Sequence, residues 1–498
     1  MVNRIVIIFL ITAGFIFPQK DSTLERKAQQ NLFSLSELRN QLDDSFNDQN
    51  FSSAIWGVFI KSLKTGEVIY KRNADKLFIP ASNMKLFTSA AALILLGPDY
   101  SYQTNILANG EIKNGILNGD LIIQGSGDPT ISNRFYSGEP TKLFEEWADT
   151  LSSYGIKEIT GNIYGDDSIF DNMGYGKGWL SDYEWSWFSA PSGALSFNDN
   201  SIEIKIEPGE LNFPAKISTT PNTQYISLVS KVITVDQNTP QSISVSRTQG
   251  TNLILVSGRI RTNSKPYIEH VSISDPTMFF LSVFKETLIS KGIAIKGRIG
   301  NIESADRTII NEDLTPLHRH ESVPLSLILK EVNKNSNNFY AEQILKTIGY
   351  EEYGYGTSLN GVRACGNILN TMGINPNNMV MVDGSGLSRL NLVSPRQIVN
   401  LLSYMHKSDD YQRFYDSLPI GGVDGTLAER MKKSSAQNNV RAKAGYNENV
   451  SSLSGYLKTI SGEQIVFSII VNNFLAPGSL ANYIEDNVCN RLVNFVRN

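Results

Sequence analysis

Apolar and polar residues change their spacing several times along this chain, and each spacing predicts a different element. Residues 55–60 and 67–71 alternate as two strands, and Lys64-Thr65-Gly66 between them predicts a hairpin turn. Pro80-Ala81-Ser82 then leads into 84–96, which is rich in Ala and Leu and ends before a Gly-Pro pair. This punctuation predicts a helix with Ser82 at its start.

The middle of the chain differs in pattern from its two ends. From about Tyr102 to Ser274, short apolar runs alternate with Gly, Asn and Pro turns, which predicts a β-rich insertion. Helical spacing returns at 276–292 and dominates 324–405. Two late strands and a final helix follow, at 450–457, 464–471 and 479–496. Strands at both ends with helices between them predict one α/β domain whose first and last segments share a sheet.

The N-terminus has the profile of a secretory signal peptide. Arg4 precedes an apolar run from Ile5 to Phe17, and the polar residues Gln19 to Ser22 follow. The run is too short to span a bilayer comfortably, and no cysteine lies near it that could carry a lipid. We therefore expect a signal peptide at 1–19 and an exported, periplasmic protein that is soluble or peripheral to the membrane.

Composition and charge narrow the range of partners. With 498 residues, of which 41% are hydrophobic and 19% charged, the chain can bury more than one core. Its 45 basic and 49 acidic residues give a net charge of -4, which argues against the basic surface that nucleic acids require. The sequence does not specify an oligomeric state.

Residues that commonly bind metals or form disulfides are few. Cys365 and Cys489 both lie in stretches of helical spacing, and we expect two buried free thiols. His318 and His320 are expected on a solvated loop rather than on a metal. Because no metal-binding spacing of Cys or His occurs, neither a metal nor a cofactor is expected.

Ser82-Asn83-Met84-Lys85 fits the spacing S-x-x-K, in which the serine is a nucleophile and the lysine one turn later takes its proton. About two such spacings are expected by chance, and Ser282-Val283-Phe284-Lys285 is a second one. Position separates them, because Ser82 begins a helix, where free N–H groups favour an oxyanion, whereas Ser282 lies mid-helix. As a base Lys85 must be neutral, so burial or a second cation should lower its pKa; otherwise it is an ordinary solvated lysine.

Two further polar clusters stand at element boundaries. The stretch from Asn335 to Glu342 contains Ser336 and Asn338 just ahead of an apolar helix, where either could also be a simple helix cap. Lys443-Ala444-Gly445 precedes a strand, so a cation is followed by a glycine where backbone can approach a substrate closely. The plainer interpretation of Lys443 is an edge-strand charge.

The order S-x-x-K, S-x-N and K-x-G, beginning at Ser82, Ser336 and Lys443, resembles the active-site set of penicillin-recognising serine enzymes. Four longer stretches narrow the resemblance: Gly127-Asp128-Pro129, Ala190 to Asn200, Asp383 to Arg389, and Gly422 to Leu427. Together they resemble the low-molecular-mass class C penicillin-binding proteins, the S13 family of D-Ala-D-Ala carboxypeptidases, from about residue 50 to the end of the chain.

This resemblance implies an α/β fold: a transpeptidase-like (β-lactamase-like) catalytic domain with an antiparallel sheet and flanking helices, interrupted by a large β-rich insertion. We place the discontinuous catalytic domain at 20–100 and 316–498. The insertion is placed at 101–315, with two subdomains, the second at about 200–272. The implied substrates are peptidoglycan stem peptides, and the implied inhibitors are β-lactam antibiotics.

The resemblance also implies a role for each motif residue. Ser82 would be the acylated nucleophile, Lys85 its general base and Ser336 a proton relay to the leaving D-alanine. Asn338 would orient the substrate, and Lys443 would supply a cation near Lys85 and the substrate carboxylate. Backbone N–H groups of Ser82 and Asn447 would form the oxyanion hole. Arg389 is implied as a contact for a charged group on the stem peptide.

One departure from the family pattern is Ala444, which stands where the family usually has threonine in K-T-G. A literal K-T-G occurs at Lys64-Thr65-Gly66, but it lies ahead of the nucleophile on the expected hairpin turn. We interpret it as a chance match to the motif.

Three alternatives to a peptidase fit the sequence less well. A β-lactamase of class A is disfavoured because no E-x-x-x-N lies between Ser336 and Lys443, and an α/β-hydrolase because no G-x-S-x-G occurs. The alternative of a different class is a catalytically silent scaffold that binds the cell wall and has lost activity with its third motif. Every side chain assigned to proton transfer is still present, which favours the enzyme.

Overall fold

The computed structural model describes residues 34–305 and 314–497. The expected signal peptide at 1–19 lies outside these residues. Within the described ranges, no helix is both long enough and apolar enough to cross a membrane.

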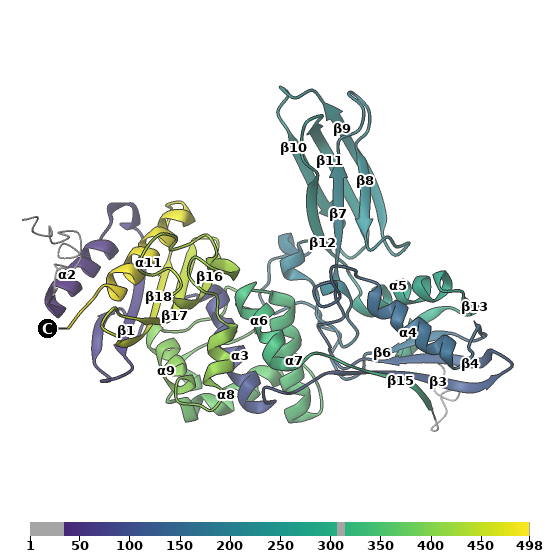
Figure 1. Cartoon of the computed structure of the whole chain (residues 1–498), viewed down its shortest axis with the longest axis horizontal. Helices are drawn as coiled ribbons and strands as arrows, with labels where there is room; N and C mark the ends of the chain where they lie inside the picture. Colours follow the sequence, from purple (N-terminus) through teal and green to yellow (C-terminus); the bar gives the residue numbers. More distant parts are fainter. Residues whose placement is uncertain (1–33, 306–313, 498) are drawn as a thin grey trace, which may run out of the picture.

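A five-stranded sheet joins the two ends of the chain (Figure 1). Its order is β16-β17-β18-β1-β2. The strands are β1 (Ile55–Ser62), β2 (Val68–Arg72), β16 (Arg441–Asn447), β17 (Val450–Lys458) and β18 (Gln464–Asn472). β1 pairs antiparallel with both β2 and β18, and Trp56 lies opposite Val471. The expected sharing of one sheet by the first and last segments is thus observed.

Helices cover both faces of this sheet, which is why β17 and β18 are buried along almost their whole length. Val466 and Ile470 of β18 face one hydrophobic core, while Ile465 and Phe467 face another. The second core contains α2 (Leu35–Phe46) and α11 (Gly478–Val493). The first contains α3 (Met84–Leu95), α6 (Leu325–Lys334), α7 (Asn338–Tyr353), α8 (Ser358–Leu369), α9 (Pro395–Met405) and α10 (Tyr411–Ser417).

The two cysteines lie in these two different cores. Cys365 belongs to α8 and Cys489 to α11, and both are buried and free. The expectation of two buried free thiols is confirmed.

A seven-stranded sheet follows α3 in the chain. It contains β3 (Gln103–Lys113), β4 (Ile116–Gln124), β5 (Glu158–Ile159), β6 (Ile163–Asp166), β13 (Ala294–Ile295), β14 (Ile299–Asn301) and β15 (Thr315–Glu321). Helices α4 (Lys142–Ser153) and α5 (Pro276–Ser290) pack in its core. The chain enters this region through β3 and leaves through β15, and these two strands pair antiparallel.

Helix α4 lies within the stretch from about Tyr102 to Ser274, which was expected to be rich in β-structure. Its buried residues Leu143, Phe144, Trp147, Ala148 and Leu151 recur at helical spacing. The insertion is therefore β-rich but contains a helix whose spacing is visible in the sequence.

Two three-stranded sheets form a lobe that projects from the rest of the molecule (Figure 1). One contains β7 (Ser201–Glu207), β8 (Lys216–Thr220) and β12 (Tyr267–Ser272). The other contains β9 (Ser227–Val235), β10 (Ser242–Arg247) and β11 (Leu253–Arg261). Alternate side chains such as Ile204 and Val256 are buried in the same hydrophobic core.

The histidine pair does not lie on a solvated loop, so that expectation was wrong. His318 and His320 belong to strand β15, where alternate residues share one face, and their rings lie 6.1 and 5.6 Å from that of Trp147. Packing against this aromatic ring explains their position. Among the described residues, no cluster of three or more His, Cys, Asp or Glu could hold a metal ion.

Candidate active site

Ser82 lies at the expected place, immediately ahead of the helix. It belongs to a short 3-10 turn, Ala81–Asn83, that continues directly into α3. Ser82 is half-buried, whereas the residues of α3 from Met84 to Leu93 are all buried. The helix is thus enclosed in the core, and the turn that precedes it lies against the edge strand β16.

Lys85 is buried with its amine directed at Ser82. Its Nζ lies 3.1 Å from Ser82 Oγ, and it also donates to Asn338 Oδ1 at 2.5 Å and to the Ser385 carbonyl at 2.7 Å. Burial lowers the pKa of Lys85 to about 7, although the carboxylates of Asp383 and Glu342 act in the opposite direction. A large fraction of Lys85 is therefore neutral near pH 7 and able to accept a proton.

Neither Ser336 nor Asn338 caps helix α7, because the asparagine between them does so. Asn337 is the N-cap of α7 and accepts from the Tyr340 N–H. Ser336, whose φ is 57°, presents its hydroxyl to Lys443 Nζ at 2.9 Å. Ser336 and Asn338 thus each face one of the two lysines.

Lys443 and Gly445 bring strand β16 against the nucleophile. A Cβ on Gly445 would lie 2.8 Å from the Ser82 nitrogen, so only glycine allows this approach. Asn83 Nδ2 fastens the contact by donating to the Lys443 carbonyl at 3.0 Å and to Ser452 Oγ at 2.7 Å. Burial, and secondarily the charge of Lys85, hold the pKa of Lys443 well below its ordinary value.

Backbone direction in β16 distinguishes the amides near Ser82. The Ala442 N–H points away from β17 and donates to the Pro419 carbonyl at 3.1 Å. Because N–H direction alternates along a strand, Tyr446 N–H points to the same free edge and Asn447 N–H towards β17. The Asn447 side chain donates to the Gly386 carbonyl at 3.2 Å.

Arg389 lies farther along the same rim, where Nη1 donates to the Glu448 carbonyl at 2.7 Å. The residue is half-buried, and its guanidinium has remaining N–H groups for an anionic ligand.

Two buried carboxylates near Lys85 were not singled out from the sequence. Glu342 accepts from the N–H groups of Gly384 and Ser385, and burial together with Asp383 raises its pKa. Asp383 accepts from the N–H groups of Gly386 and Ser388. They hold the loop whose Ser385 carbonyl contacts Lys85. An acidic residue within the buried run Phe339–Leu345 was the available signal for Glu342.

The second S-x-x-K has none of these surroundings. Ser282 Oγ donates to the Met278 carbonyl at 2.7 Å within α5, and Lys285 Nζ donates to the Gly297 carbonyl at 2.9 Å. The literal K-T-G at Lys64-Thr65-Gly66 is also far from Ser82. Its turn lies beside Gln464 at the start of β18, whereas Ile79, three residues before Ser82, lies beside Asn472 at the end of β18. Both interpretations made from the sequence agree with these positions.

A serine hydroxyl at a helix start, in contact with a buried lysine of lowered pKa, has the geometry that a serine nucleophile and its general base require. The D-Ala-D-Ala carboxypeptidase 3 (S13) family matches residues 38–493, and the chain belongs to this family. The family resemblance inferred from the sequence is confirmed.

Individual relatives agree with this membership. The chain is similar to the D-alanyl-D-alanine carboxypeptidase of Actinomadura sp. (strain R39), with 33% identity over 479 residues covering 93% of this chain and 85% of the relative. It is also similar to the crystal structure of penicillin binding protein 4 (dacB) from Haemophilus influenzae, with a TM-score of 0.79 and 26% identity over 91% of this chain and 99% of that one. A second structure of that protein, with a TM-score of 0.74, contains a novel β-lactam. The predicted α/β fold is confirmed.

Proposed function

We propose that this enzyme hydrolyses the D-Ala-D-Ala bond of peptidoglycan stem peptides through an acyl-enzyme on Ser82, and that penicillins acylate the same serine. The observation that carries the proposal is the 3.1 Å contact of Lys85 Nζ with Ser82 Oγ, in a site where burial lowers the lysine pKa to about 7. The relatives named carboxypeptidases supply the substrate class.

In the acylation step, neutral Lys85 takes the hydroxyl proton as Ser82 Oγ bonds to the carbonyl carbon of the penultimate D-alanine. The C–N bond then breaks, and the leaving amine of the terminal D-alanine gains a proton through Ser336, whose hydroxyl contacts Lys443. In deacylation, neutral Lys85 takes a proton from a water whose oxygen bonds to the ester carbonyl carbon, and it returns that proton to Ser82 Oγ as the C–O bond of the ester breaks. Asn338, Lys443 and Arg389 are proposed to hold the peptide and its carboxylate.

The oxyanion is proposed to bind the N–H groups of Ser82 and Tyr446. Tyr446 replaces the expected Asn447, because the alternation of β16 turns the Asn447 N–H towards β17. Asn447 keeps a role in shaping the rim through its contact with Gly386.

We further propose that the protein is exported to the periplasm after removal of 1–19. The catalytic domain is proposed to comprise 20–100 and 316–498, with an insertion at 101–315 whose second subdomain spans about 200–272. The pairing of β3 with β15 at the two junctions supports these boundaries. Cleavage of peptide cross-links is a second activity that the same acylation chemistry would allow.

Incubation of the mature protein with benzylpenicillin, followed by mass spectrometry, tests the proposal. One penicilloyl adduct on Ser82 and release of free D-alanine from a D-Ala-D-Ala peptide are expected. A protein that forms no adduct and releases no D-alanine would instead be the silent scaffold. Turnover of penicillin as fast as acylation would indicate a β-lactamase.

A further inference from the structure

A short segment of the insertion forms one side of the environment of Asn338. We call Ser181–Ser189 the wall segment; it contains two 3-10 turns, Ser181–Tyr183 and Trp187–Ser189. The Phe188 carbonyl accepts from Asn338 Nδ2 at 2.7 Å, while Asn338 Oδ1 accepts from Lys85 Nζ at 2.5 Å. The amide of Asn338 is thus fixed at both ends, and its orientation depends on where the wall segment lies.

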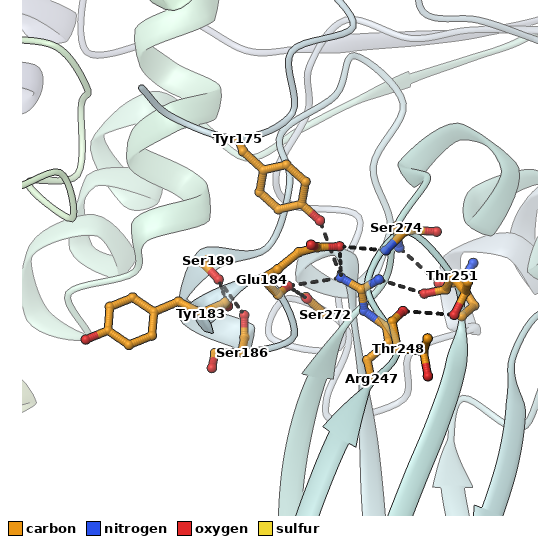
Figure 2. Close-up of polar contacts among 12 residues, drawn as sticks. Tyr175, Tyr183, Glu184, Ser186, Ser189, Arg247, Thr248, Thr251, Ser272 and Ser274 are labelled. Carbon is orange, nitrogen blue, oxygen red and sulfur yellow. Dashed lines mark hydrogen bonds and ion pairs between the residues drawn. The ribbon is translucent and has the colours of Figure 1, made fainter. Parts of the chain in front are cut away.

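The other end of the wall segment is held by a buried arginine of the projecting lobe (Figure 2). Arg247, the last residue of β10, donates through Nη2 to the Glu184 carbonyl at 3.0 Å and to Glu184 Oε1 at 3.3 Å. Its Nη1 donates to the Thr251 carbonyl at 2.6 Å, which ties the guanidinium to the β10–β11 turn. The Tyr175 hydroxyl lies 3.4 Å from Nη2.

Neighbouring backbone groups complete this contact. Gly250 N–H donates to Glu184 Oε1 at 3.1 Å, and Ser272 Oγ donates to the Glu184 carbonyl at 2.6 Å. Ser272 N–H donates to the Trp185 carbonyl at 3.0 Å, which places the wall segment beside β12. The lobe therefore holds the segment at Glu184, which bonds to residues of β10, β12 and the β10–β11 turn, and also through the backbone of Trp185 and Ser186 beside β12.

The ion pair between Arg247 and Glu184 lies mostly away from water, so it matters for the contact between the lobe and the wall segment. The side chains of Arg247 and Glu184 are 1% and 16% exposed. Removing one member of a buried pair leaves the other charge without its partner, so the segment would have to move to rehydrate it. In an exposed pair water would replace the partner at little cost.

We propose that Arg247 is a positioning residue for acylation: the lobe holds the wall segment through Glu184, and the segment in turn sets the orientation of Asn338 against Lys85. This inference rests on the proposed function of Ser82 and Lys85. Arg247 itself touches no reacting atom.

The test compares full-length mature variants in the rate of benzylpenicillin acylation, followed by intact mass. Arg247→Met is expected to lower the acylation rate constant about ten-fold, the scale of one hydrogen bond to a charged group. Glu184→Gln keeps an oxygen acceptor for Arg247 and should have a smaller effect, and Arg247→Lys should restore part of the rate. The matched control is Lys205→Met in the exposed Lys205–Glu207 pair of the same lobe, which should acylate at the parental rate.

The rate constant is taken from the time course to the final adduct level, so unfolded molecules lower only that level. If Arg247→Met only loses stability, the final adduct level falls while the acylation rate constant stays at the parental value. That result would overturn the proposal for Arg247 and would leave the proposed function of Ser82 and Lys85 intact. Should Arg247→Met fail to fold, Glu184→Gln carries the same test. Absence of any adduct in the parental protein would overturn the function as well.

Discussion

The same four-residue spacing occurs twice in this chain, at Ser82–Lys85 and at Ser282–Lys285, but the serine contacts its lysine only in the first. At the start of α3 the serine hydroxyl faces Lys85 Nζ at 3.1 Å. In the middle of α5 the serine hydroxyl is already bonded to a backbone carbonyl one turn earlier, and its lysine serves another carbonyl. A helical serine far from the first turn has this acceptor always within reach, whereas Ser82 does not.

The lysines differ for a related reason. Lys85 is enclosed in a helix whose residues from Met84 to Leu93 are all buried, so desolvation lowers its pKa, while Lys285 remains half-buried on the flank of α5. The spacing supplies the two groups, and the position within the helix decides whether they can react.

Replacing each of the two serines by alanine should give the largest difference in penicillin acylation. Ser82→Ala should abolish the penicilloyl adduct, because no other hydroxyl lies against Lys85 among its hydrogen bonds in the described residues. Ser282→Ala should leave the adduct and its rate unchanged. Peptide mapping of the adduct decides the matter, and an adduct on Ser282 would contradict the assignment.

The corresponding lysine variants should differ by somewhat less. Lys85→Ala should lower acylation about 10²- to 10⁴-fold, the usual contribution of a general base, and Lys285→Ala should not. Circular dichroism of both variants controls for folding. If Lys85→Ala acylates at the parental rate, the base lies elsewhere, and Lys443 is the next group to test.

The pH dependence of acylation sharpens the contrast between the lysines. Because burial lowers the pKa of Lys85 to about 7, protonation inactivates the base as the pH falls through that value. The rate should therefore drop about ten-fold for each pH unit below the pKa. Measured on the parental protein and on Lys285→Ala, the two profiles should coincide. A profile that is flat from pH 5 to 8 would be inconsistent with a Lys85 base of this pKa.

The sequence predicted those parts of the site whose residues carry local signals. Ser82 is marked by the helix punctuation around it, and the shared sheet follows from strand patterns at both ends. Glu342 and the contact of Phe188 with Asn338 were not predicted, because each depends on chain segments that only tertiary packing brings together. The proposed use of the Tyr446 N–H in place of the Asn447 N–H depends on the register of β16 with β17, which the sequence alone does not give.

A second pair of similar stretches, Lys64-Thr65-Gly66 and Lys443-Ala444-Gly445, gives the smallest predicted effect. Only the latter adjoins Ser82, although it lacks the threonine hydroxyl. Ala444 is half-buried on an edge strand, so a threonine there could donate to the substrate carboxylate.

We expect Ala444→Thr to raise kcat/KM on a D-Ala-D-Ala peptide about ten-fold or more, since a hydrogen bond to a charged group contributes about 1.5–3 kcal/mol. Thr65→Ala, at the remote turn, is the matched control and should change nothing. A neutral or harmful Ala444→Thr would mean that another group, such as Asn447 or a bound water, already occupies the position of the missing hydroxyl. In that case this chain has adapted its rim to the alanine, and Asn447→Ala should then lower kcat/KM more in the parental protein than in Ala444→Thr.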